Sequence, residues 1–179
     1  MRTERTDRGK RPIPPLDAAG LDRLALRYVE RFATTRGRLA DYLRRKIRER
    51  GWDGPAVDPP ALAQRMADLG YVDDLAYAEA KAAAMGRRGL GGRRVSLALR
   101  QAHIGATEAD EIAPMVADRA IDSALTFARR RRLGPFGEAP IDRAVREKQI
   151  GAMVRAGHGF DLSRRIVDAK REIDPDDLL

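Results

Sequence analysis

The sequence predicts an all-α protein, and three observations support that fold class. Apolar residues recur at spacings of three and four along nearly the whole chain, as on the buried face of a helix. No stretch alternates apolar and polar residues with β-branched enrichment, as a strand would. Asp, Gly and Pro stand at intervals where helices begin and end. The spacing predicts nine helices of about three turns each.

Length and composition limit the classes of protein that remain. The chain has 179 residues, of which 43% are hydrophobic, enough to build a core. Its 35 Lys and Arg outnumber 27 Asp and Glu, giving a net charge of +8 that attracts nucleic acid and acidic protein surfaces. The absence of Cys excludes disulfides, zinc fingers and thiol catalysis. No apolar run is long enough to span a bilayer, and no signal-peptide pattern is present. We therefore expect a cytoplasmic monomer without membrane contact.

The first three helices follow from spacing and punctuation. Apolar residues over 21–32 predict the first helix, and those over 39–50 the second, which ends at Gly51 in the usual place of a C-terminal glycine. Asp58, followed by proline, predicts the N-terminus of the third helix, which ends at Gly70.

The next three helices begin at a stronger start signal. Asp73 stands as an N-cap, with Val72 and Tyr77 at the positions of a hydrophobic staple. This helix runs to a glycine-rich break at residues 89–92, and the following one ends near residue 105. Thr107 and Asp110 resemble a capping box that opens the sixth helix. Because Pro114 falls inside it, we expect that helix to be short or kinked.

The last three helices are separated by a linker. Apolar residues over 121–128 predict a helix that runs into four consecutive arginines. Gly and Pro residues predict a linker over 133–140. Two further helices carry apolar residues over 145–154 and 162–173, and residues 174–177 form an acidic stop.

An internal repeat groups these helices. The pairs Gly51-Trp52, His103-Ile104 and Gly159-Phe160 follow the second helix of each group at similar intervals. The repeat predicts three tandem three-helix units over 16–70, 71–117 and 118–179, which follow a flexible basic tail over 1–15.

Residues 70–74 form the sharpest motif of the chain, and the glycine-basic-apolar segment at 89–95 follows it. Both resemble the signature of the RecX family, bacterial regulators of the RecA recombinase, and the similarity extends over residues 21–173. The signature residues are Gly70, Tyr71, Val72, Asp73 and Asp74. His103 departs from the glycine that is usual in the family, and the third unit carries extra residues around Gly157 and His158.

The resemblance implies an elongated, curved helical array without enzymatic activity. Such a protein would bind in the groove of the RecA–DNA filament and limit ATP hydrolysis and strand exchange, with effects on DNA repair, homologous recombination and the SOS response. Some family members also contact DNA, so single- or double-stranded DNA is a further candidate partner.

The adjacent carboxylates of Asp73 and Asp74 invite a metal-site interpretation. Neighbouring residues at a helix start do not converge on one ion as spaced ligands do. We therefore interpret residues 70–74 as helix-capping architecture, with Tyr71 packed at the junction of the first two units.

Three groups of arginines are the candidate binding residues. Residues 86–100 contain no Asp or Glu, and they lack the strand and the Gly-x-x-x-x-Gly-Lys-Ser/Thr pattern of a phosphate loop. We interpret this segment as an anion-binding loop, in which backbone N–H groups and guanidinium groups meet DNA phosphates or RecA carboxylates. For the other two groups a solvated helix face is an equal alternative, although all three could line one concave side of the array. The candidates are Arg87, Arg88, Arg93, Arg94, Arg100, Arg44, Arg45, Arg48, Arg129, Arg130, Arg131 and Arg132.

No catalytic residue, cofactor or metal site is predicted. His103 and His158 are interpreted as turn residues, and Trp52 and Phe160 as core anchors. The serines lack the context of an activated nucleophile.

The leading hypothesis is therefore a non-enzymatic modulator, most often an inhibitor, of RecA. The alternative is a stand-alone helical DNA-binding regulator, which the net charge suits. No single helix offers the Asn, Gln and Arg mixture of a base reader. A hydrolase or nuclease has no supporting motif.

Overall fold

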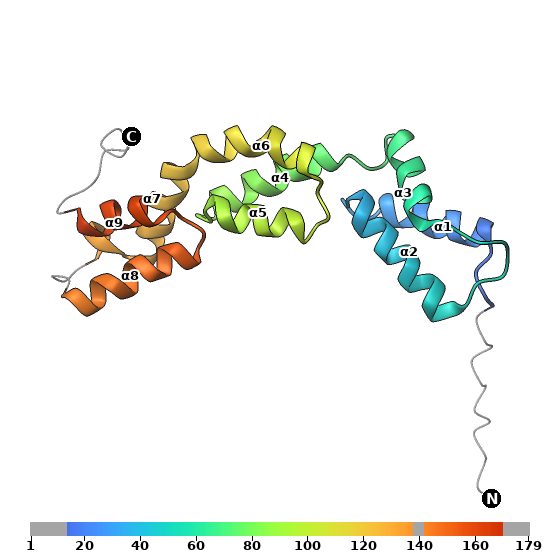
Figure 1. Cartoon of the computed structure of the whole chain (residues 1–179), viewed down its shortest axis with the longest axis horizontal. Helices are drawn as coiled ribbons and strands as arrows, with labels where there is room; N and C mark the ends of the chain where they lie inside the picture. Colours follow the sequence, from blue (N-terminus) through green and yellow to red (C-terminus); the bar gives the residue numbers. More distant parts are fainter. Residues whose placement is uncertain (1–13, 138–141, 170–179) are drawn as a thin grey trace, which may run out of the picture. The chain divides into compact units, whose positions relative to one another are not determined.

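A computed structural model describes residues 14–137 and 142–169. Within these residues the chain forms nine α-helices and one short 3-10 helix, and the sole β-pairing is an isolated bridge between Leu16 and Trp52 (Figure 1). The predicted all-α class is confirmed. None of the described helices is long and apolar enough to cross a membrane. Most of the predicted basic tail and the acidic stop at 174–177 lie outside the described residues.

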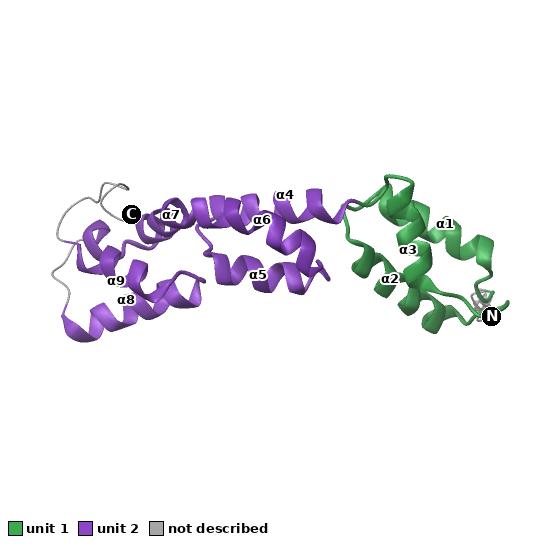
Figure 2. Ribbon diagram, turned by 45° about the horizontal axis from the view of Figure 1, so that its top comes forward, with its two compact units in different colours: residues 1–72 green, residues 73–179 purple. Residues whose placement is uncertain are grey.

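The chain divides into two compact units, one ending at Val72 and the other beginning at Asp73 (Figure 2). Unit 1 has one hydrophobic core, whereas unit 2 has two, one built from residues 75–116 and the other from residues 121–169. The predicted boundary at residue 117 lies inside unit 2. The division into three tandem units stays a prediction.

Unit 1 consists of α1 (Ala18–Val29), α2 (Arg36–Arg50) and α3 (Pro59–Asp68). Each helix has a side-chain N-cap, and Asp58 accepts from the Ala61 N–H as its position predicted. Helix α2 ends at Gly51, whose φ of 82° favours glycine. Trp52 packs against this core as expected, and its Nε1 donates to the Pro55 carbonyl at 2.7 Å.

The first half of unit 2 consists of α4 (Asp74–Arg87), α5 (Gly92–Arg100) and α6 (Ala106–Asp118). Asp73 caps α4, because its Oδ1 accepts from the Ala76 N–H at 2.8 Å. The predicted staple is wrong: Val72 belongs to the core of unit 1, whereas Tyr77 packs in the core of α4–α6.

Helix α6 departs from its prediction at its start. It begins at Ala106 with Gly105 as an N-cap that has no side-chain hydrogen bond, so the capping box at Thr107 is wrong. The helix has 13 residues and includes Pro114, so of the two alternatives, short or kinked, the short helix is excluded. Ala113 and Pro114 are exposed, where the lost backbone hydrogen bond is tolerated most easily.

The second half of unit 2 consists of α7 (Ala120–Arg131), the 3-10 helix η1 (Gly134–Phe136), α8 (Arg143–Arg155) and α9 (Phe160–Asp168). The start of the predicted linker is structured: Gly134 is buried, and its N–H donates to Gln149 Oε1 at 2.7 Å.

Two aromatic residues that were expected to pack are exposed. Phe160 is 57% exposed, so it is not the predicted core anchor. Tyr71 is 50% exposed, and its packing at the junction of the first two predicted units stays a prediction. Phe160 opens α9 directly after the N-cap Gly159, and the buried face of that helix is formed by Ile166 and Val167 instead.

We predict that Asp73→Ala lowers the free energy of unfolding by about 1 kcal/mol, because the Ala76 N–H loses its acceptor. Asp73→Asn keeps an acceptor oxygen and should retain most of the stability. Urea unfolding followed by circular dichroism measures both changes. Equal loss in the two variants would contradict the capping role.

Candidate macromolecule-binding surface

All twelve candidate arginines are exposed, but they lie on different units. Those at 44, 45 and 48 are on α2 of unit 1, and the others belong to unit 2. Within unit 2 they lie at the end of α4, along α5 and at the end of α7.

The end of α7 and the end of α4 are in direct contact. Arg130 Nη1 donates to the Arg88 carbonyl at 3.3 Å. Nearby, the backbone of Phe127 lies so close to Gly89 that a Cβ there would be 2.8 Å from the Phe127 nitrogen. The arginines near residue 88 and those near residue 130 are therefore brought together, which the sequence did not predict.

This contact carries a local excess of positive charge. The sequence contains no Asp or Glu between Glu79 and Glu108, nor between Asp122 and Glu138. The guanidinium group of Arg129 lies over the ring of Phe136 at 5.2 Å, and that of Arg131 over Phe127 at 5.9 Å. These ring contacts orient the arginines without neutralising them.

The arginines of α2 have a different environment. Arg44 pairs with Asp41 at 2.8 Å, and both Lys46 and Arg45 approach Glu49, at 2.6 and 3.7 Å. The hydrogen bond from Lys46 lowers the pKa of Glu49 below its ordinary value. Because carboxylates of the same helix face these cations, the α2 group fits the solvated-face alternative better than the unit 2 arginines do.

The glycine-rich turn at residues 89–92 is a packing contact. The Gly91 N–H donates to the Ala156 carbonyl at 3.0 Å, and the Arg93 N–H donates to the Gly157 carbonyl at 3.2 Å. These two N–H groups at the start of α5 are therefore engaged. The Gly91 and Arg93 N–H groups therefore do not contribute to the predicted anion-binding loop, whose arginine side chains stay candidates.

His158 completes the same contact. It is 2% exposed, and its Nε2 lies 3.1 Å from the Gly89 carbonyl oxygen. Its ring also packs against Phe127, with centroids 5.7 Å apart. Burial lowers the pKa of His158 below its ordinary value of 6.5. The prediction that His158 is a turn residue is confirmed, and the extra residues around Gly157 are what reach the α4–α5 turn.

His103 is likewise a turn residue, directly after α5. Its φ of 58° lies in the left-handed region that favours glycine.

The remaining polar candidates have structural partners. The Ser123 and Ser163 hydroxyls donate to carbonyls of Ala120 and Gly159, at 3.0 and 2.6 Å. Among the described residues, no group of three or more His, Asp or Glu could hold a metal ion. The described chain is thus a helical protein whose exposed chemistry is a surface of guanidinium groups, as in a macromolecule-binding protein.

Comparisons with known proteins give a consistent family. The regulatory protein RecX of Myxococcus xanthus is 29% identical over 180 residues, covering 93% of this chain and 94% of that protein. The regulatory protein RecX of Agrobacterium fabrum is 28% identical over 159 residues, covering 87% and 85%. No protein-family model matches the chain.

Solved structures have the same fold. The crystal structure of RecX from Lactobacillus salivarius aligns with a TM-score of 0.62 and 18% identity, over 85% of this chain and 95% of that one. A second crystal structure of regulatory protein RecX aligns with a TM-score of 0.58 and 22% identity, over 84% and 73%. These relatives and structures support the RecX family of regulatory proteins for this chain.

We predict that Gly91→Ala destabilises unit 2 by at least about 2 kcal/mol, because steric overpacking has a large cost. The added Cβ would lie 2.4 Å from the Gly157 carbonyl carbon, which is backbone and cannot turn away. Gly86→Ala is the matched control, since its Cβ meets nothing within 4 Å and Ala favours the helix. Thermal unfolding of both variants tests this contact, and equal stability would contradict it.

We predict that the stability of unit 2 falls as the pH is lowered below 6.5. The unfolded chain then binds a proton at His158 that the folded chain resists, so acid favours unfolding. His158→Gln should flatten this part of the pH profile, whereas His103→Gln, at an exposed turn, should leave it unchanged. The measurement is urea unfolding between about pH 5 and 8. An identical pH profile in His158→Gln and the unmodified chain would contradict the prediction.

Proposed function

We propose that this RecX-type regulator is a non-enzymatic modulator of the RecA recombinase that binds in the groove of the RecA–DNA filament. Bound there, it limits ATP hydrolysis and strand exchange, and so moderates DNA repair and the SOS response. Family membership supports RecA as the partner. The observation that carries the proposal is the contact between the arginine-rich ends of α4 and α7, in a part of the sequence where residues 80–107 and 123–137 contain no Asp or Glu.

The arginines suit this role because each guanidinium presents several N–H donors in a fixed plane. Such groups bind carboxylates of a protein and phosphates of DNA with the same geometry. Since the N–H groups of Gly91 and Arg93 are engaged within the chain, the affinity comes from side chains on a rigid backbone. Binding that depends on them weakens as salt rises.

The proposal also places the protein in the cytoplasm, as a monomer, where RecA acts. A stand-alone DNA-binding regulator is the competing hypothesis. It requires sequence preference on bare DNA and no response to RecA, and the same assays separate the two.

We predict that the purified chain slows DNA-dependent ATP hydrolysis and strand exchange by RecA. The simultaneous change of Arg87, Arg88, Arg93 and Arg94 to Ala should raise the concentration for half-inhibition by at least about tenfold, a loss of about 1.4 kcal/mol in binding. The matched control removes four other exposed arginines outside the candidate set. These are Arg23, Arg27, Arg143 and Arg164.

The control variant has the same net charge as the test variant, so it should inhibit nearly as well as the unmodified chain if position matters. Equal weakening of inhibition in both variants would mean that total charge, and not the position of the arginines, determines inhibition. Failure of the unmodified chain to bind RecA filaments or to change either rate would refute the proposed function.

A further inference from the structure

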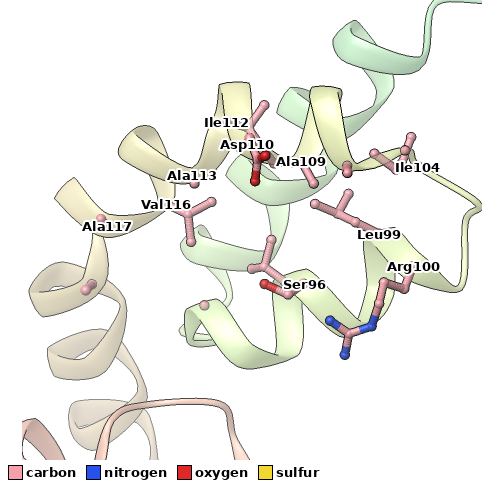
Figure 3. A pocket seen from close by; sticks show the side chains of 15 residues that line it. Ser96, Leu99, Arg100, Ile104, Ala109, Asp110, Ile112, Ala113, Val116 and Ala117 are labelled. Carbon is pink, nitrogen blue, oxygen red and sulfur yellow. The ribbon is translucent and has the colours of Figure 1, made fainter.

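An apolar groove runs between α5 and α6 in unit 2, and the arginine surface does not account for it. Its volume is about 630 Å³, within the range of ligand-binding pockets. Figure 3 shows Leu99 of α5 and Ala109 and Val116 of α6 directed toward the same space. The polar side chains among its lining residues are those of Ser96, Arg100 and Asp110.

The groove exists because the middle helices pack differently from their neighbours. In unit 1, α3 lies closely along α2, and at the end of unit 2, α9 lies closely along α8. Helix α6 instead packs mainly on α4, and it shares few contacts with α5. The apolar space that a closely packed helix fills in the other two groups is left open here.

The wall formed by α6 is smooth. Alanines recur along it at the three- and four-residue spacing of one helix face, with Ile112 and Val116 beside them. They are Ala106, Ala109, Ala113 and Ala117 on α6, followed by Ala120 at the start of α7. The α6 part of this row is about 17 Å long at 1.5 Å per residue, and its small side chains allow another helix to approach closely.

The two walls carry opposite charge. Helix α5 has three arginines and no carboxylate, and Arg100 lies at the groove. Helix α6 has four carboxylates and no Lys or Arg, and Asp110 lies at the groove. An occupant with charge of one sign would be repelled by one wall, so the complementary occupant is acidic on one flank and basic on the other.

The occupant is helical for a reason of hydrogen bonding. Both walls are α-helices, whose backbone groups are mostly used within the helix. An extended segment would bring unsatisfied N–H and C=O groups into an apolar groove, whereas a helix satisfies its own.

We propose that the α5–α6 groove docks an amphipathic helix of a partner protein, with carboxylates facing Arg100 and cations facing Asp110. This docking site is separate from the arginine surface and does not depend on the proposed action on RecA.

The test uses the full chain and a labelled helical peptide of about 14 residues, the length of the groove. The peptide carries Leu at the positions of one helix face, Glu along one flank and Lys along the other. A second peptide with Lys on both flanks and a scrambled peptide of the first composition are the comparators. Fluorescence anisotropy measures binding.

We expect the Glu/Lys peptide to bind at least about tenfold more tightly than the all-Lys peptide, and the scrambled peptide not to bind. Ala113→Trp, which fills the groove from an exposed helix position, should weaken binding by at least about tenfold. Ala80→Trp, on the exposed face of α4, is the matched control and should bind normally. Arg100→Glu should weaken the Glu/Lys peptide and strengthen the all-Lys peptide.

Three results would overturn the proposal: no binding of the Glu/Lys peptide up to ~100 μM, equal binding of the scrambled peptide, or no effect of Ala113→Trp. A dimer in sedimentation that Ala113→Trp disrupts would also overturn it, because a second copy of the chain would then be the occupant. Inhibition of RecA is measured separately, so the groove and the arginine surface succeed or fail independently.

Discussion

The close approach of two backbone turns determines how unit 2 is built. The backbones of the two turns are so near at Gly91 and Gly157 that neither position has room for a Cβ. Two backbone hydrogen bonds join the turns. His158 reaches across the same contact to the Gly89 carbonyl, and burial there lowers the pKa of its imidazole. Through this contact the helices from α4 to α6 and those from α7 to α9 form one compact unit.

The same contact determines which groups are available for binding. It engages the Gly91 and Arg93 N–H groups at the start of α5, so these two donors are not available to an anion. In return it fixes the α4–α5 turn beside the end of α7, where Arg130 meets the backbone of Arg88. The α4–α5 turn thus takes part in internal packing and also carries candidate arginines. Substitutions that loosen the turn are expected to disturb the surface as well.

The groove between α5 and α6 marks a difference in packing between the middle group of three helices and the other two groups. Each group of three helices buries one apolar core, but α6 lies along α4 and leaves α5 partly uncovered. Opposite charges on the two walls and a row of alanines then distinguish this surface from an ordinary packing gap.

The sequence by itself determined the helical class, most helix ends and the resemblance to the RecX family, because these depend on local periodicity, capping and short motifs. Asp58, Asp73 and Gly51 act where their positions predicted, since a cap involves only neighbouring residues. The tertiary structure decided what depends on contacts between distant residues. The separation of Val72 from Tyr77, the exposure of Phe160 and the engagement of the Gly91 N–H by Ala156 could not be read from spacing. Local rules specify where a helix begins and ends, but only packing specifies which of its faces and backbone groups remain free.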